Sequence, residues 1–335
     1  MSNITLQINL APSDWLHACH ILPHQLRQFA GQVDEVLLTL DLHRSIGRFS
    51  EGWEERLPKI EALIQECCQQ YTHVRSLTVD YSPEAISAVS QAFFGDQLIP
   101  AKDFRGGPFY SYFYGLYSAS HDYVFHIDSD LMFGGGSQTW IQEAIQFLQN
   151  HPNVLVCGPL PGAPSGSETL YSQSAHRFPY SSLAFQLDEM STRYFLFDRA
   201  RFRQQIGALP LPYAAPWGFI KAILEGNPPY RLPEDILSKM MAKQGLLRVE
   251  FLGQEQGMWS LHPPYRCADF YDRLPELIQR IETGNIPDEQ RGYHDVNESL
   301  IDWSIAREAL KQNRWWKRLA KRWQQSQLQI SQAKQ

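Results

Sequence analysis

The stretch "YVFHIDSDLMF", from Tyr123 to Phe133, ends an apolar run with two aspartates separated by one serine. An apolar run of this length that stops at polar residues is typical of a buried β-strand. Side chains alternate along a strand with a period of two, so the sequence predicts that the carboxylates of Asp128 and Asp130 point to the same side. Two carboxylates at that spacing repel each other unless a cation lies between them. The pair therefore predicts a cation-binding site at the end of the strand.

Strand-like and helix-like segments alternate on both sides of this stretch. The other expected strands are 4–12, 33–41, 74–80, 153–160 and 246–253, and the expected helices are 14–29, 51–71, 107–120, 138–150 and 233–244. This alternation predicts an α/β fold with a mainly parallel sheet and helices on both faces. Ligands of such sheets bind beyond the carboxyl ends of the strands. Asp41, Asp80 and the Asp128/Asp130 pair all fall at those ends.

Composition places the chain among ordinary globular proteins, with 43% hydrophobic and 20% charged residues. The first residues lack the basic and apolar regions of a signal peptide, and no window approaches the roughly 18 apolar residues that span a bilayer. The five cysteines form no CxxC pair, and their odd number argues against a disulfide framework. We therefore expect a cytoplasmic protein with reduced cysteines.

Charge is unevenly distributed along the chain. The net charge is −6, but residues 304–335 hold eight Lys/Arg and one acid (+7), so the remainder carries −13. A duplex-DNA binder would carry its basic stripe on the folded domain, so we expect no nucleic-acid partner. Residues 301–335 are predicted to form a basic amphipathic helix, with Trp316, Leu319, Ala320 and Trp323 on one face. Such a helix suits an anionic membrane surface on the cytoplasmic side, and docking on the acidic body explains it equally well.

The acidic pair has four possible interpretations. An EF-hand loop is excluded because Met132 and Phe133 stand at a ligand and at the glycine position. A phosphohydrolase of the haloacid dehalogenase type would use Asp128 as nucleophile, but the small β-branched residue expected at Met132 and a downstream lysine are missing. Acids that merely solvate a strand end are the third possibility. The fourth is a divalent cation bound to a diphosphate, because Mg²⁺ and Mn²⁺ take carboxylate oxygens, bridge to phosphates and neutralise a leaving group.

Four motifs in succession support the fourth interpretation. They are "DYVFHIDSD" (122–130), "RYFLFDRARFRQQIGALP" (193–210), "PEDILSKMMAKQG" (233–245) and "SLHP" (260–263). In this order they resemble the DxD motif, an aromatic strand followed by a turn, the ED motif and the histidine of the GT-A glycosyltransferases, particularly family 2. The resemblance covers residues 3–266 and implies a GT-A fold, Rossmann-like in its nucleotide-binding part. It also implies a hexosyltransferase that uses a nucleoside-diphosphate sugar, with UDP favoured.

The resemblance also implies roles for individual residues. The metal, Mn²⁺ or Mg²⁺, would be held by Asp128, Asp130 and His262, whose imidazole suits Mn²⁺ better. The nucleotide sugar would be contacted by Asp41, Asp80, Lys102, Arg105 and Asp128. From the sequence alone Lys102 and Arg105 are equally well explained as loop charges, and His262 is better explained as a loop histidine.

Glu234 and Asp235 follow Pro233 at the start of a predicted helix. Acids at this position stabilise the positive end of a helix dipole, which by itself explains both residues. The resemblance implies that one of them, Asp235 by analogy with the family, accepts the proton of the attacking acceptor hydroxyl. A base opposite the leaving group would invert the configuration of the sugar.

Residues 207–234 form an insertion relative to the family pattern. Tyr213, Trp217 and Tyr230 lie in it and are candidates for stacking on an acceptor, either a glycan or a lipid-linked molecule, with packing as the alternative. The QxxRW motif of processive synthases is absent, so a single transfer is expected. We expect one domain over 1–300, with a nucleotide-sugar half (1–135) and an acceptor half (136–266). A non-catalytic sugar-nucleotide binder of the same fold is the alternative from another class.

Overall fold

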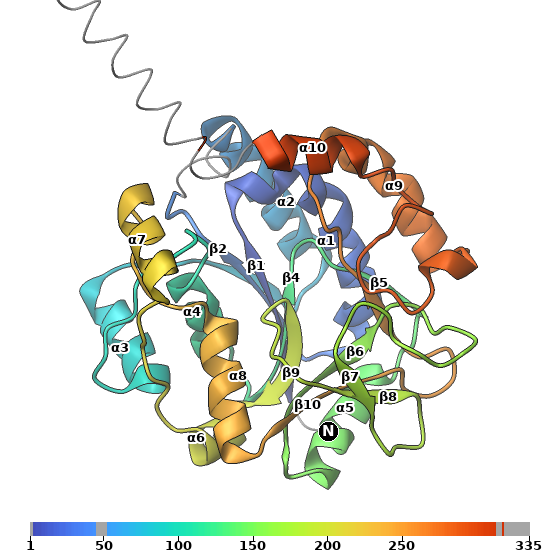
Figure 1. Cartoon of the computed structure of the whole chain (residues 1–335), viewed down its shortest axis with the longest axis horizontal. Helices are drawn as coiled ribbons and strands as arrows, with labels where there is room; N and C mark the ends of the chain where they lie inside the picture. Colours follow the sequence, from blue (N-terminus) through green and yellow to red (C-terminus); the bar gives the residue numbers. More distant parts are fainter. Residues whose placement is uncertain (1–2, 45–51, 313–316, 318–335) are drawn as a thin grey trace, which may run out of the picture.

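The computed structural model describes residues 3–44, 52–312 and 317. A central sheet runs through the molecule in the order β3-β2-β1-β4-β9-β6-β10-β8-β7 (Figure 1). Its strands are β1 (Ile4–Leu10), β2 (Glu35–Leu40), β3 (Val74–Thr78), β4 (Tyr123–Asp128), β6 (Val154–Pro161), β7 (Ala175–Arg177), β8 (Ala184–Leu187), β9 (Tyr194–Asp198) and β10 (Leu247–Phe251). The short strands β5 (Met132–Gly134) and β11 (Trp259–Leu261) pair with each other, and β11 also pairs with β6.

Most of the sheet is parallel. β1 runs parallel to β2 and β4, β2 runs parallel to β3, and β6 runs parallel to β10. β9 lies antiparallel between β4 and β6, and β8 and β7 continue the sheet in antiparallel pairs. β2 and β6 are buried along their whole length, as parallel strands covered on both faces require. The predicted α/β class with a mainly parallel sheet is confirmed.

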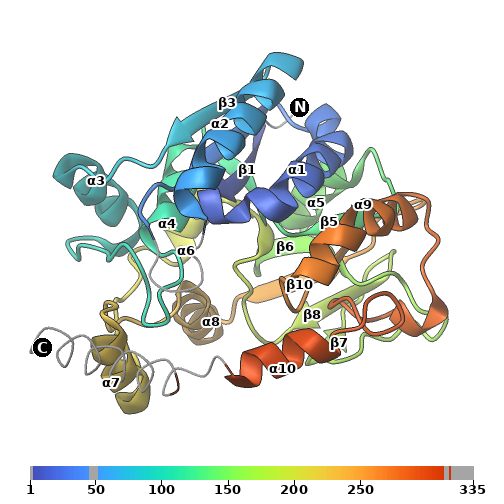
Figure 2. The same ribbon diagram turned by 90° about the horizontal axis from the view of Figure 1, so that it is seen from above.

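Helices cover both faces of the sheet (Figure 2). One face packs against α1 (Trp15–Phe29), α2 (Trp53–Gln70) and α5 (Trp140–Asn150), and the opposite face packs against α3 (Pro83–Phe94), α4 (Tyr110–Ser118), α6 (Arg199–Gln205) and α8 (Pro233–Gln244). β4 shows how the pleat divides the core, since Val124 belongs to the second layer whereas Phe125 and Ile127 belong to the first. α7 (Pro216–Glu225) lies inside the predicted insertion.

A third core cluster extends the body beyond residue 266. α9 (Ala268–Glu282) buries Phe270 and Leu274 together with Trp303, which precedes α10 (Ser304–Gln312). His24 of α1 ties α9 to β5: the Phe133 amide donates to its Nε2 at 2.9 Å, and its Nδ1 lies 2.7 Å from Glu282 Oε1. The position of Arg266, directly before α9, is therefore set by a packed helix.

The predicted C-terminal helix lies mainly outside the described residues. α10 corresponds to the first part of this predicted helix. The predicted apolar face lies among residues that the structure does not describe: Trp316, Leu319, Ala320 and Trp323. In the described part of the chain, every helix is too short or too polar to cross a membrane. All five cysteines carry free thiols, as expected.

Candidate active site

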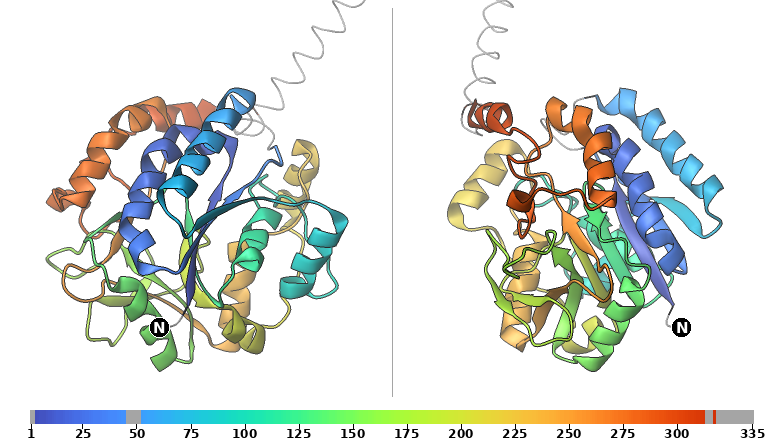
Figure 3. Two further views of the ribbon diagram at one scale, coloured as in Figure 1. Left: turned by 180° about the vertical axis from the view of Figure 1, so that it is seen from behind. Right: turned by 90° about the vertical axis from the view of Figure 1, so that its right-hand side faces the viewer.

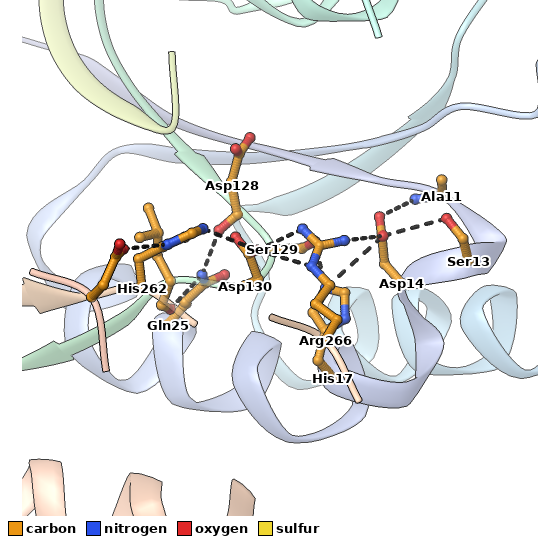
Figure 4. A network of polar contacts seen from close by, with 12 residues as sticks. Ala11, Ser13, Asp14, His17, Gln25, Asp128, Ser129, Asp130, His262 and Arg266 are labelled. Carbon is orange, nitrogen blue, oxygen red and sulfur yellow. Dashed lines mark hydrogen bonds and ion pairs between the residues drawn. The ribbon is translucent and has the colours of Figure 1, made fainter. Parts of the chain in front are cut away.

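The two aspartates that suggested a cation site point in different directions. β4 ends at Asp128, and the chain turns at Ser129 and Asp130, so the alternation expected from a continuing strand stops there. The Asp128 carboxylate lies 3.4 Å from His126 Nε2, on the face of the sheet that α4 covers. Figure 4 shows it directed away from the network that holds Asp130. The prediction that both carboxylates share one side is therefore wrong.

Asp130 is buried and has a cationic partner, but that partner is an arginine. Arg266 Nε donates to its Oδ2 at 3.0 Å, and Nη2 donates to the same oxygen at 2.5 Å. Burial acts to raise the pKa of Asp130, but the Arg266 guanidinium holds it well below its usual range. The carboxylate is thus ionised and neutralised by a nearby charge.

Asp14 and His17 complete the surroundings of this ion pair (Figure 4). Asp14 Oδ1 lies 3.5 Å from Arg266 Nη1, yet burial raises the pKa of Asp14 to about 6. Burial lowers the pKa of His17 to about 3, so its imidazole is neutral, and its Nε2 lies 3.1 Å from Ser129 Oγ. Arg266 therefore faces one firmly ionised carboxylate and one that titrates near neutrality.

His262 lies beside Asp130 with its ring held from behind. Its Nδ1 is 2.8 Å from Asp295 Oδ1, and its Nε2 is 3.7 Å from Asp130 Oδ2. A carboxylate behind one ring nitrogen fixes the orientation and raises the basicity of the other, which is the arrangement of many metal-binding histidines. Nε2 is thereby directed at the acidic end of β4.

The fit of a divalent metal can be judged from these atoms. Within residues 3–44, 52–312 and 317, no group of three or more His, Cys, Asp or Glu could hold a metal. Two donors do fit: His262 Nε2, and Asp130, whose buried Oδ1 has no hydrogen-bond partner among the described residues. Mg²⁺ and Mn²⁺ accept such a small protein set when diphosphate oxygens and waters complete it. Asp128 does not belong to this set, and a metal would compete with Arg266 for Asp130.

A cavity of about 820 Å³ borders this site. Asp295, which orients His262, lies in its wall, and Arg193, whose carbonyl accepts a hydrogen bond from the Asp128 amide at 2.7 Å, lies there too. Three arginines and five acids contribute to a strongly polar lining. These charged residues are Arg193, Arg248, Arg307, Asp188, Glu189, Glu234, Asp295 and Glu298. A polar ligand such as a sugar suits these walls.

Glu234 faces the cavity at the start of α8. Thr192 Oγ1 donates to its Oε2 at 3.3 Å. Burial raises the pKa of Glu234, and the nearby Asp103 carboxylate acts in the same direction, so this carboxylate is a stronger base than an ordinary glutamate. Asp235 is exposed and is not part of the cavity wall. The structure thus separates the two acids that the sequence left together.

Tyr112 connects Glu234 to the end of β4. It lies on α4, and its pKa is raised well above the usual value, first by burial and then by the carboxylates of Asp128 and Glu234. Both acids therefore lie close to one phenol, on the same face of the sheet. Asp128 and Glu234 thus lie near one phenol, whereas Asp130 and His262 lie beside each other, and of these four residues Glu234 lines the cavity.

The remaining predicted nucleotide contacts lie at the ends of β2 and β3 and in the loop between α3 and α4. Lys102 Nζ donates to Asp41 Oδ2 at 3.1 Å in a buried pair, and Tyr81 donates to the other oxygen of Asp41 at 2.9 Å. Asp80 is exposed and accepts a hydrogen bond from the Ser82 amide at the start of α3. Arg105 is also exposed and lies 5.2 Å from the centre of the Phe104 ring.

The predicted acceptor aromatics come together, but outside the cavity wall. Tyr213 and Tyr230 stack with ring centres 5.1 Å apart, and Trp217 is 82% exposed on α7. None of the three is among the cavity-lining residues.

Sequence reasoning missed three residues that shape the site. Arg266 stands four residues after His262 in "HPPYR", and its spacing carries no signal of an ion pair with Asp130, 136 positions earlier. Asp295 and Thr192 lie in loops without periodicity. The signal in the sequence that could have indicated Thr192 is its position as a polar residue directly before the motif "RYFLFD".

We compared the chain with known proteins. No family model and no curated protein sequence matches it. Solved structures with a similar chain trace include Staphylococcus aureus TarS in complex with UDP-GlcNAc, at 13% identity over 77% of this chain and 58% of that one, with a TM-score of 0.42. GalNAc-T7 with UDP, GalNAc and Mn²⁺ shares 10% identity over 92% of this chain and 53% of that one, with a TM-score of 0.44.

A third similar structure is 4-diphosphocytidyl-2C-methyl-D-erythritol synthase from Anaerococcus prevotii, at 10% identity over 83% of this chain and 99% of that one, with a TM-score of 0.38. The chain spans 36 to 60% of the length of the first three matches, all of them TarS chains. Every TM-score quoted lies below 0.5, so we base no conclusion on these similarities. The fold class stated above depends on the strand order alone.

Proposed function

We propose that this chain is a glycosyltransferase of GT-A type that moves a hexose from a nucleoside-diphosphate donor to an acceptor hydroxyl in a single, inverting transfer. The observation that carries the proposal is a polar cavity lined by Glu234 and by Asp295, the hydrogen-bond partner of His262. Asp130 and His262 offer donors for a cation, whereas Glu234 offers a base whose pKa burial raises. A diphosphate leaving group and an acceptor hydroxyl need these two different functions.

In the proposed reaction the acceptor lies in the 820 Å³ cavity and Glu234 takes the proton of its hydroxyl. The acceptor oxygen bonds to the anomeric carbon while the bond from that carbon to the diphosphate oxygen breaks, and the electron pair leaves with the diphosphate. Thr192 orients Glu234 through its hydrogen bond. Base and leaving group lie on opposite sides of the sugar, so the configuration inverts.

Arg266 serves the leaving group in this proposal. Its guanidinium is held at the edge of the site by Asp130, and arginine binds phosphate oxygens through paired N–H groups. A bound Mn²⁺ or Mg²⁺ on Asp130 and His262 would supply Lewis-acid stabilisation of the diphosphate. Asp128, and the Asp41–Lys102 pair beyond it, are proposed to contact the nucleoside, with a UDP-sugar as the favoured donor.

Release of UDP from a panel of UDP-sugars, with Mn²⁺ and with EDTA, tests the proposal. Wild-type protein should release UDP, Glu234→Gln should lose about 10²- to 10⁴-fold in rate, and Asp235→Asn should stay within a few fold. The neighbouring Asp235 is a matched control, since it is an acid one residue away that lies outside the cavity wall.

Thermal shifts with UDP separate the alternatives. A protein that is stabilised by UDP but releases none from any donor is a non-catalytic binder. Phosphate release from simple phosphomonoesters, abolished by Asp128→Asn, would instead indicate a phosphohydrolase. Absence of both UDP stabilisation and turnover refutes the proposal.

A further inference from the structure

The aromatic residues of the insertion take part in an unusual surface on α7. A globular helix normally buries its apolar side, yet the one buried residue of α7 is Ala222. Phe219 is half-buried and packs against the Tyr213 ring, but the other large apolar side chains of the helix are turned to solvent. They are Trp217 (82% exposed), Ile220 (46%), Ile223 (60%) and Leu224 (49%), with Tyr213 (58%) beside the helix. We call these five residues the α7 patch.

Local packing holds the patch in place. Gly218 lies against the Phe104 ring, since a Cβ on it would come within 3.1 Å of that ring, and the Phe104 amide donates to the Tyr230 carbonyl at 2.9 Å. Tyr213 is stacked on Tyr230. The side of α7 that faces the body is therefore packed against Phe104. This packing keeps the apolar side chains of the α7 patch exposed to solvent.

We infer that the α7 patch docks on the surface of an anionic lipid bilayer. The charged side chains around the patch favour this occupant: Lys221 on α7, Arg231 with its Nε bonded to the Tyr213 carbonyl, and Arg105 over Phe104. Glu225 on the same helix forms an ion pair with Lys221 at 3.7 Å, so the positive charge beside the patch rests mainly on Arg231 and Arg105. Exposed Trp and aliphatic side chains ringed by cations suit the boundary between headgroups and acyl chains.

A second helix with exposed apolar residues lies on the same side of the molecule. Ile305 (80% exposed) and Leu310 (48%) lie on α10, and Figures 1–3 place α10 and α7 along one side of the body. Six further Lys/Arg follow α10 in the sequence, within residues 313–335. The cavity wall includes Trp303 and Arg307 at the start of α10, so a bilayer on this side would lie near the cavity. The inference does not depend on the proposed chemistry.

Flotation of the full-length protein with vesicles tests this inference. Wild-type protein should float with phosphatidylglycerol vesicles and less with phosphatidylcholine vesicles, because the surrounding cations add to apolar insertion. The double variant Trp217→Gln/Ile223→Gln should lower the partition coefficient at least about tenfold, since each side chain loses most of its transfer free energy. Both residues are exposed, so the melting temperature should stay unchanged.

Tyr117→Gln is the matched control, because Tyr117 is a 44% exposed aromatic at the end of α4. It should float like the wild type. Wild-type protein that binds neither kind of vesicle, or a double variant that floats as well as the wild type, overturns the inference. A wild-type dimer that the double variant dissociates, without any change in flotation, would also overturn it and identify a second copy as the occupant. Since flotation measures no turnover, a failure here is distinct from a failure of the proposed reaction.

Discussion

Removing the charge of Asp130 should reveal how much the buried ion pair with Arg266 contributes to stability. Asp130→Asn keeps the shape of the side chain but leaves the guanidinium without its principal counter-charge. Breaking a buried pair from one side costs about 3–5 kcal/mol. The lower end, about 3 kcal/mol, applies here because the Arg266 side chain is 35% exposed and keeps Asp14 as a second partner at 3.5 Å.

This loss converts into a change of melting temperature. Unfolding entropy of about 2.1 cal/mol/K per residue, over 335 residues, gives about 0.7 kcal/mol/K, so 3 kcal/mol lowers Tm by about 4 °C. Calorimetry of the metal-free protein at pH 7 measures this shift. Asp128→Asn is the matched control, because its 30% exposed carboxylate lies 3.4 Å from His126 and makes no close ion pair with Arg266 among the described residues, and its Tm should fall by less than about 1.5 °C. Equal shifts for the two variants, or no shift for Asp130→Asn, would refute the description of Asp130 as a buried, paired anion.

Three further predictions concern charge and pH. The acidic limb of the log(kcat/KM) profile should lie above pH 4.5, because burial raises the pKa of Glu234. Thr192→Val should move this limb to higher pH, since the variant removes a hydrogen bond that lowers the Glu234 pKa. An acidic limb at the same pH in Thr192→Val and wild type would contradict this assignment. Hydrogen bonding from His24 lowers the folded-state pKa of Glu282 to about 2, so its stabilisation is present above pH 4.5 and is lost as the pH falls toward 2. The Tm difference between Glu282→Gln and wild type should shrink over that range, whereas exposed Glu276→Gln on the same helix should show little difference at any pH. Arg266→Gln should raise the affinity of the protein for Mn²⁺ alone by at least about tenfold in calorimetric titration, since the competing cation is removed; an unchanged or weaker affinity would show that Arg266 and the metal do not share Asp130.

Much of the sheet was predictable because parallel strands buried on both faces read as continuous apolar runs. β1, β2, β4 and β6 lie within two residues of their expected bounds at nearly every end, and Pro233 and Gly245 bounded α8 as expected. The helices α3, α6, α7 and α9 were missed. α9 carries a proline at position 275 and lies beyond the segment that the family resemblance covers, so neither periodicity nor resemblance pointed to it.

The candidate site was predictable in its residues but less so in its geometry. Asp130 follows β4 and His262 follows β11, whereas Glu234 at the start of α8 faces the cavity that Asp295, the partner of His262, also lines. The shared direction of Asp128 and Asp130 was wrongly predicted because strand alternation was extended past Asp128 into residues that form a turn. The separation of Glu234 from Asp235 is a matter of one helical step, about 100° around the axis, and adjacent sequence positions cannot show which of the two faces inward.

Because Asp130 and Arg266 are paired with each other, a ligand that binds either of them must break this ion pair. Any cation that takes the carboxylate must release the guanidinium, and any phosphate that draws the guanidinium away leaves the carboxylate in need of a cation. The two events therefore favour each other, so a nucleotide and a metal should each bind poorly alone and well together. Such mutual dependence would keep free metal ions from occupying the protein between turnovers.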